Sequence, residues 1–377
     1  MLGCYDAHDG RIDFIGNKIQ KPFQDVKQRA FTPSTSQKLL DELTTNDHYH
    51  HLHMIDDAVH KAAVEYFHSI DATWCNLPLT TKMISSPGEV YAGKKLDYTT
   101  DALPVSLQWF DDESIFLAES SQFYLELRLL IDKLSRVYSI YNSFRKEPAD
   151  FSHLSEFQHI EFEGKVSFEE NNKIVVDMLR AITAYILKHN EADLRYYLTP
   201  VEIEELAVSF DERNIEVIPF ADAMKLLANK LSDTKYNEIS LRHFGSYEEV
   251  ALTRLIGKHC QVVEFPLEEI PFYHDASFTN KDGKQFAKNA DFILLGYREV
   301  VGAGQRITDI KAIREKAKFF NLPEEDYRPY IEMRNMATYQ TTCGFGMGWQ
   351  RYTQWLLKMP FIWELSHIPR GHFSPRP

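Results

Sequence analysis

The stretch that decides the fold is Phe144-Arg145-Lys146-Glu147, followed after a short polar loop by His153-Leu154-Ser155-Glu156-Phe157-Gln158-His159-Ile160-Glu161-Phe162-Glu163. Carboxylates alternate with other residues in the second segment, which is typical of a strand, and the short loop predicts a hairpin. Arginine binds phosphate through two parallel hydrogen bonds, and a carboxylate accepts from an amine. The pair of strands therefore predicts a hairpin that holds a nucleotide beside an amine.

The composition is that of a globular protein with a full-sized core, because 44% of the 377 residues are hydrophobic. No apolar run approaches the roughly 20 residues of a membrane-spanning helix. The N-terminus lacks a basic segment followed by an apolar one, so we expect a cytoplasmic protein without membrane contact. Four scattered cysteines without a CxxC pair argue against a zinc ribbon, and the net charge of −13 disfavours a large nucleic-acid partner.

The order of apolar and polar segments predicts an α+β fold, an antiparallel sheet flanked by helices. Residues 1–45 are expected to form an N-terminal arm and residues 46–377 one domain, with a helical excursion at about 172–232. Apolar spacing from Ser36 to Ser69 predicts two helices separated near Asn46. The predicted hairpins make the sheet antiparallel. Further helices are expected at Gln122 to Leu134, Lys173 to Lys188, Pro200 to Ser209, Phe220 to Leu231, Asp309 to Phe320 and Tyr352 to Leu357.

A second constellation runs from Asp291 to Arg306. The turn at Gly296-Tyr297 lets Asp291 and Glu299 approach each other across paired strands, and two adjacent carboxylates are costly unless a cation lies between them. Magnesium bound to ATP phosphates meets that need. The alternative is an ordinary hairpin with charged, solvent-facing ends, which is about as common.

A third constellation, from Cys343 to Arg351, carries glycines at positions 344, 346 and 348. Small residues at alternate positions of a strand clear one face for a flat ring, and Arg351 follows at the start of a helix. Close strand packing is the alternative, because a GxGxG pattern by itself is weak. Judged by their spacing alone, Arg145 and Glu147 are more often an ion pair on the protein surface than part of a binding site.

Taken in order, these motifs resemble the catalytic domain of class II aminoacyl-tRNA synthetases, specifically the aspartyl/asparaginyl branch. Ser120 to Glu126 resembles the amino-acid-binding segment of that branch, and Phe144 to Glu163 resembles its second class motif. Glu299 to Arg306 resembles the metal and substrate strand, and Gly344 to Arg351 resembles the third motif. The resemblance runs from about residue 47 to the end of the chain.

The resemblance implies a role for each matching position. The catalytic residues would be Arg145, which holds the α-phosphate, Arg351, which braces the γ-phosphate, and Glu299, which holds magnesium. ATP would be bound by Arg145, Glu147, His153, Phe157, Glu249 and Arg351. The amino acid would be bound by Gln122, Glu161, Glu163 and Arg306. Magnesium would be held by Asp291, Glu299 and Glu249.

Some positions depart from the branch. Ser152 stands where the branch usually has an arginine, and Gln350 replaces an acidic residue. Leu125 stands where aspartyl enzymes carry a lysine, so the pocket resembles the asparaginyl type. Only about 45 residues precede the first class motif, which is too few for the anticodon-binding barrel of this branch. We therefore do not expect tRNA as a partner.

The resemblance thus implies an enzyme with ATP and Mg²⁺ as cofactors, similar to archaeal asparagine synthetases related to these enzymes. It would activate an aspartate- or asparagine-like amino acid as an acyl-adenylate and pass the acyl group to ammonia or a small amine, releasing AMP. Transfer to a tRNA or a carrier protein is one alternative. A non-catalytic regulatory role is another, although the intact motif arginines argue against it. The first class motif implies a homodimer.

Overall fold

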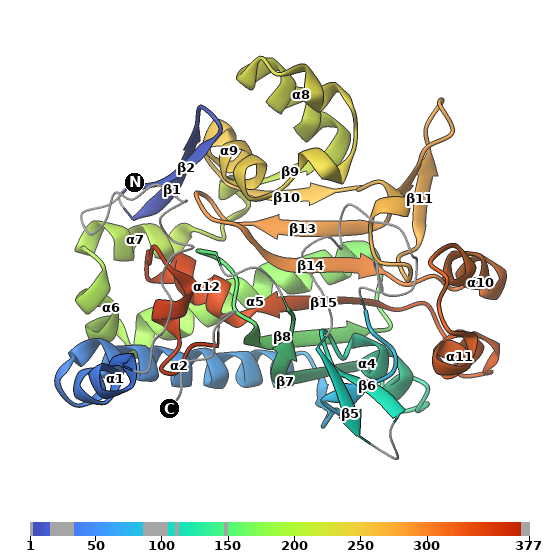
Figure 1. The fold of residues 1–377 in the computed structure, drawn as a ribbon, viewed down its shortest axis with the longest axis horizontal. Coiled ribbons are helices and arrows are strands. Elements are labelled where there is room, and N and C mark those ends of the chain that lie inside the picture. Colours follow the sequence, from blue (N-terminus) through green and yellow to red (C-terminus); the bar gives the residue numbers. More distant parts are fainter. Residues whose placement is uncertain (1–2, 16–33, 86–104, 110–112, 147–149, 371–377) are drawn as a thin grey trace.

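The computed structural model describes residues 3–15, 34–85, 105–109, 113–146 and 150–370 (Figure 1). Glu147, predicted to bind ATP, lies outside these ranges. In the described part of the chain, eight strands form the central sheet. In spatial order they are β3 (Thr73–Trp74), β7 (Arg136–Phe144), β8 (Glu156–Gly164), β15 (Cys343–Gly348), β14 (Glu299–Gln305), β13 (Asn289–Ile293), β10 (His259–Val263) and β9 (Ile215–Pro219).

The sheet is antiparallel from β7 to β10 and parallel only at its two edges, where β3 pairs with β7 and β9 pairs with β10. The predicted α+β fold, an antiparallel sheet flanked by helices, is confirmed (Figure 1). The helices of the described residues are α1 (Ser34–Thr45), α2 (Asp47–Ser69), α4 (Gln122–Arg128), α5 (Phe168–His189), α6 (Glu191–Tyr197), α7 (Pro200–Val208), α8 (Phe220–Leu231), α9 (Ser246–Ile256), α10 (Ile310–Phe319), α11 (Glu324–Glu332) and α12 (Trp349–Leu356).

The main core lies between the sheet and the helix pair α2 and α5, which pack on each other. The two helices predicted on either side of Asn46 are confirmed: Asn46 caps α2 by accepting a hydrogen bond from the His48 N–H at 3.0 Å. Aromatic rings connect helix and sheet, because Phe162 of β8 stacks on Phe67 of α2 and on Phe345 of β15, with ring centroids 5.9 and 5.2 Å apart.

Residues 172–232 are integrated into the fold rather than set apart from it. Helix α5 packs on β14 and β15, and β9 extends the sheet beyond β10. Helix α6 and strand β9 were not predicted, because each is short and carries a weak periodic pattern. The helix predicted from Gln122 ends early, at Arg128, where the chain tightens into successive hydrogen bonds between residues three apart.

Residues 3–15 of the predicted arm include a hairpin, β1 (Cys4–His8) and β2 (Arg11–Ile15), which lies against α9 (Figure 1). The Tyr5 N–H donates to the Gly296 carbonyl in the β13–β14 turn at 2.8 Å. Gly296 has a φ of +69°, and a Cβ there would lie 2.8 Å from the Cys4 Cβ, so both backbone and packing require glycine.

Two further small sheets complete the described strands. Strands β4 (Thr80–Thr81), β6 (Glu113–Leu117) and β5 (Ser106–Trp109) pair antiparallel, as do β11 (Ala276–Thr279) and β12 (Gln285–Ala287). Among the described helices, none is both long and apolar enough to cross a lipid bilayer.

Removing the Phe162 ring is expected to destabilise the fold. The side chain is fully buried between Phe67 and Phe345, so Phe162→Ala should lower the free energy of unfolding by about 3–5 kcal/mol. Urea denaturation followed by circular dichroism measures this change. Phe162→Leu, which still fills most of the space, should lower the free energy of unfolding by less than half as much. Equal effects of the two substitutions would show that the ring stack contributes nothing specific.

Candidate active site

The register of the sheet places one row of site residues across four strands. Glu161 of β8 pairs with Gly346 of β15, which pairs with Gly302 of β14, which in turn pairs with Asp291 of β13. Directly paired residues point to the same face of a sheet, so two carboxylates flank two glycines. The middle of this row carries no side chain, which lets a ligand lie close to the backbone.

A second row lies two residues along and is filled by protein atoms. Here Glu163 pairs with Gly344, which pairs with Gly304. A Cβ on Gly344 would overlap the carboxylate of Glu163 and the amide of Gln122, and one on Gly304 would overlap the His274 ring. These glycines make room for side chains of the site, whereas the sequence predicted that the glycines of β15 clear space for a ring.

Above the first row lies a cavity of about 450 Å³. It is lined by most of the predicted site residues and by others that sequence reasoning missed. The predicted ones are Gln122, Arg145, His153, Phe157, Glu161, Glu249, Asp291, Glu299, Arg306 and Arg351. Glu163 is fully buried beneath the cavity. The fold thus gathers eleven predicted residues from α4 through α12 around one space.

Glu161 is a buried carboxylate with neutral partners. Its Oε1 accepts from the Ser120 hydroxyl at 2.6 Å, and its Oε2 accepts a short hydrogen bond from the Tyr141 hydroxyl. Burial raises the pKa of Glu161 from 4.5 to about 7, and the two hydroxyl donors only partly offset that effect. A cation bound at this carboxylate would be strongly favoured, because it would compensate for the solvation that the charged carboxylate loses on burial.

Arg306 and Glu163 form an ion pair whose side chains are 3% and 0% exposed. The Arg306 Nη2 lies 2.8 Å from Glu163 Oε2, and the Nε lies 3.1 Å from Oε1. Gln122 Nε2 adds a donor to Glu163 Oε2 at 2.7 Å. The Arg306 guanidinium also lies over the Tyr273 ring, at 5.1 Å from its centroid. The floor of the cavity is therefore fixed and close to neutral.

A second buried ion pair lies behind the first and was not predicted. Arg334 Nη2 lies 3.2 Å from Glu126 Oε1, and Tyr330 donates to Glu126 Oε2 at 2.6 Å. Arg334 Nε also donates to the carbonyl of Ile307 at 2.7 Å. Because Ile307 follows Arg306 in the chain, this network fixes the backbone that carries the first ion pair.

The end of the cavity that is expected to hold the nucleotide contains Arg145 and Phe157. Both come from the hairpin formed by β7 and β8, and the Arg145 guanidinium carbon lies 5.5 Å from the centroid of the Phe157 ring. The Arg145 N–H donates to the Ser155 carbonyl at 3.0 Å, which closes the loop of the hairpin. The predicted hairpin is present in the structure, and the pairing of its strands brings an arginine and an aromatic ring to one side of the cavity.

Asp291 and Glu299 suit a divalent cation. Glu299 Oε1 and Asp291 Oδ1 lie 2.9 and 3.9 Å from the point where a Cβ on Gly302 would stand, so the two carboxylates share one space. Burial, followed by repulsion from Glu299 and Glu249, raises the pKa of Asp291 well above its usual value. A hard cation with oxygen ligands would relieve this repulsion.

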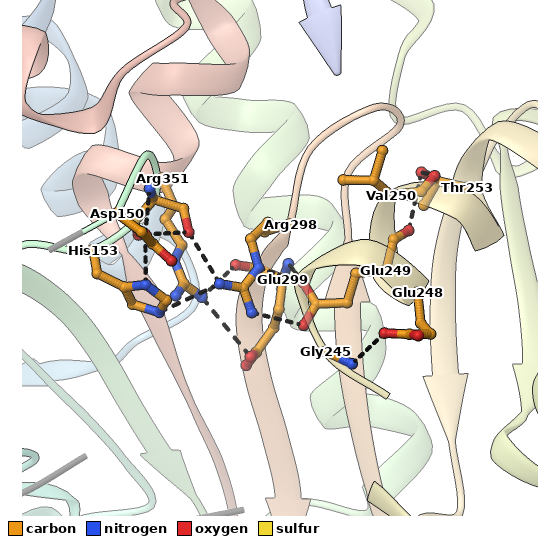
Figure 2. A network of polar contacts seen from close by, with 11 residues as sticks. Asp150, His153, Gly245, Glu248, Glu249, Val250, Thr253, Arg298, Glu299 and Arg351 are labelled. Atoms are coloured by element: carbon orange, nitrogen blue, oxygen red, sulfur yellow. Dashed lines mark hydrogen bonds and ion pairs between the residues drawn. The ribbon is translucent and has the colours of Figure 1, made fainter. Parts of the chain in front are cut away.

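The remaining end of the cavity is a network of charged groups (Figure 2). Arg351 donates from Nη1 to the Glu299 carbonyl at 3.0 Å and from Nε to the Ser152 carbonyl at 3.2 Å. His153 Nδ1 lies 2.7 Å from Asp150 Oδ1, and Arg298 stands at the centre, between His153 and Glu249. Arg298 and Asp150 were missed by sequence reasoning, although Arg298 directly follows the predicted turn.

Comparison with known sequences identifies the family to which this geometry corresponds. The family described as tRNA synthetases class II (D, K and N) matches residues 37–372. The asparagine–tRNA ligase of Thermus thermophilus is 28% identical over 286 residues, which cover 74% of this chain and 62% of that protein. The asparagine–tRNA ligase of Desulforamulus reducens is 25% identical over 316 residues, 83% of this chain and 67% of that protein. The chain thus spans about three fifths to two thirds of the length of these relatives.

Comparison with solved structures supports the same fold. Asparaginyl-tRNA synthetase from Pyrococcus horikoshii, solved with asparaginyl-adenylate, superposes with a TM-score of 0.77 at 20% identity, covering 98% of this chain and 79% of that chain. The Entamoeba histolytica asparaginyl-tRNA synthetase, also solved with asparaginyl-adenylate, gives 0.74 at 19% identity, covering 99% and 83%.

The buried carboxyl of Glu161 is expected to make stability depend on pH. Its pKa is about 7 in the folded protein and near 4.5 when unfolded, so the unfolded chain loses this proton first. The contribution of Glu161 to stability is therefore highest below pH 4.5 and falls by about 3 kcal/mol as pH rises through 7. Glu161→Gln should remove this decrease, as measured by urea unfolding at a series of pH values. Glu204→Gln, at an exposed site on α7, is the control and should leave the profile unchanged. A Glu161→Gln profile parallel to that of the wild type would contradict the assignment.

Proposed function

Because the chain belongs to the class II tRNA synthetases (D, K and N), we propose that it activates an asparagine-like amino acid with ATP. An oxygen of the amino-acid carboxylate attacks the α-phosphorus, a new P–O bond forms, and the bond to pyrophosphate breaks. The product is an aminoacyl-adenylate. The observation that carries this proposal is the row of Glu161, Gly346, Gly302 and Asp291, which offers one open floor with an acid at each end.

Glu161 is proposed to bind the ammonium group of the amino acid. Its carboxylate is buried and accepts hydrogen bonds from two hydroxyl groups, so a substrate ammonium in direct contact would stabilise its charged form. With the ammonium fixed there, the substrate carboxylate would lie over the bare glycines of the row, in the cavity that Arg145 also lines. Arg145 then lies where negative charge gathers on the α-phosphate, and such an arginine stabilises the transition state.

The side chain of the amino acid is proposed to lie on the Arg306–Glu163 pair. Because Glu163 already neutralises Arg306, a substrate carboxylate there would lack a counter-charge. A neutral amide instead accepts from the guanidinium and donates to the carboxylate. This favours asparagine over aspartate, in agreement with the asparaginyl adenylates bound in the structural relatives.

For the nucleotide, we propose that adenine lies beside Phe157 and that Glu147 contributes to its binding. Arg351 and His153 would meet the outer phosphates. Mg²⁺, when bound by Asp291 and Glu299, would supply positive charge that offsets the phosphates. Glu249 is the further acidic candidate, although both of its carboxylate oxygens accept from Arg298.

The acceptor of the acyl group is proposed from the relatives. Those compared above are asparagine–tRNA ligases, which favours transfer to the 3′ end of a tRNA. Ammonia or a small amine is the second candidate, as in an asparagine synthetase that starts from aspartate. The net charge of −13, which opposes binding of a polyanion, favours that second candidate.

A homodimer is proposed to form through the face of α2 and the edge strand β3. Trp74 is 54% exposed at that edge and lines a hollow of about 700 Å³ together with Asp56 and Trp349. An exposed tryptophan beside a hollow is typical of an interface. Sedimentation should give twice the chain mass, and Trp74→Glu should shift it toward the monomer. A wild-type protein that sediments as a monomer at all concentrations rules this out.

Activation is tested by ATP–pyrophosphate exchange with each amino acid. We expect exchange with asparagine, weaker exchange with aspartate, and a loss of about 10²–10³-fold in Arg145→Ala. Arg314→Ala, at an exposed ion pair with Glu332, is the control and should retain full exchange. Failure to exchange with any amino acid would exclude adenylate formation and favour the regulatory alternative.

The acceptor is tested by the release of AMP. In the presence of asparagine, AMP release that depends on tRNA supports tRNA charging. In the presence of aspartate, AMP release that depends on ammonia supports the amide ligase.

A further inference from the structure

Arg298 is a partly buried arginine that no part of the proposed reaction uses. Its Nε and Nη2 donate to the two carboxylate oxygens of Glu249, each at 3.1 Å. The Glu249 oxygens are fixed in turn, because Oε2 also accepts from the Glu299 N–H at 2.9 Å. The side chains of Arg298 and Glu249 are 12% and 9% exposed. The guanidinium is thus anchored on one edge by a bidentate ion pair.

The other edge of the guanidinium has weaker partners. Arg298 Nη1 donates to the Ser152 hydroxyl at 3.0 Å and to His153 Nε2 at 3.3 Å (Figure 2). Since an arginine only donates, His153 Nε2 is the acceptor, and its Nδ1 carries the proton that Asp150 accepts. Both acceptors on this edge are neutral, whereas a phosphate oxygen is charged and forms a stronger hydrogen bond.

Two guanidinium groups converge at this point. Arg298 donates to the hydroxyl of Ser152, and Arg351 donates to the carbonyl of the same residue at 3.2 Å. Both arginines, Ser152 and His153 line the cavity. Each guanidinium already has a carboxylate on another side, Glu249 for Arg298 and, at 3.9 Å, Glu299 for Arg351, so an anion between the two arginines would meet donors that are already held in place.

We infer that Arg298 is a further phosphate-binding residue, whose Nη1 exchanges Ser152 and His153 for an outer phosphate oxygen of ATP while Glu249 keeps the opposite edge fixed. The inference rests on the proposed adenylation and specifies the residues that bind the pyrophosphate portion. The anchored arginine pre-forms the site, so less entropy is lost on binding.

The test compares binding of inorganic pyrophosphate with binding of AMP, each by calorimetry in the presence of Mg²⁺. Arg298→Lys keeps the charge beside Glu249 and removes the Nη1 donor, so pyrophosphate affinity should fall at least tenfold while AMP affinity stays within twofold. A fall of less than threefold for pyrophosphate, or an equal fall for AMP, overturns the inference. Arg314→Lys is the matched surface control.

If Arg298→Lys does not fold, a second variant at Ser152 tests the same inference. Ser152→Ala removes one neutral competitor for Nη1, so pyrophosphate should bind at least twofold more tightly. Unchanged or weaker binding would mean that Ser152 itself serves the phosphate, and the inference fails. A wild-type protein that binds neither AMP nor pyrophosphate instead contradicts the proposed adenylation, so the two failures are distinguishable.

Discussion

The buried ion pair between Arg306 and Glu163 is the interaction on which the rest of the site depends. Neither charge has access to water, so each requires the other, and losing one partner would cost about 3–5 kcal/mol. The pair also restricts which residues can occupy the neighbouring positions. Gly344 must lack a side chain because Glu163 and Gln122 fill that space, and the network of Arg334 and Glu126 fixes the following backbone. The floor of the cavity is neutral as a result.

The register of the sheet also leaves an open surface beside this ion pair, on which a ligand can lie. Because β8, β15, β14 and β13 are aligned, Gly344 admits Glu163 in one row, while Gly346 and Gly302 leave the next row bare. The carboxylates Glu161 and Asp291 mark the two ends of that bare row, one suited to an ammonium and the other to a divalent cation. Behind the sheet, Phe162 points to the opposite face from Glu161 and Glu163, so the core packing sets the positions of both acids.

Much of this arrangement is predictable from the sequence, because many of the site residues lie close together along the chain. The hairpins at Arg145 and Glu299 and the strand at Gly344 each carry their residues within one short segment, so resemblance and spacing locate them. The Arg298 network joins Asp150, Glu249 and Arg298, which come from three distant segments, and only the folded chain brings them together. The Arg334–Glu126 pair was missed for the same reason, since an arginine in an irregular turn carries no periodic signal.

The central claim is that a neutralised Arg306 selects a neutral side chain. The most direct measurement is the affinity of two non-hydrolysable adenylate analogues, asparaginyl- and aspartyl-sulfamoyl adenosine, which differ only in that side chain. The account predicts that the asparaginyl compound binds about a hundredfold more tightly, because the aspartyl carboxylate would lie buried without a counter-charge. Equal affinities, or tighter binding of the aspartyl compound, would contradict it.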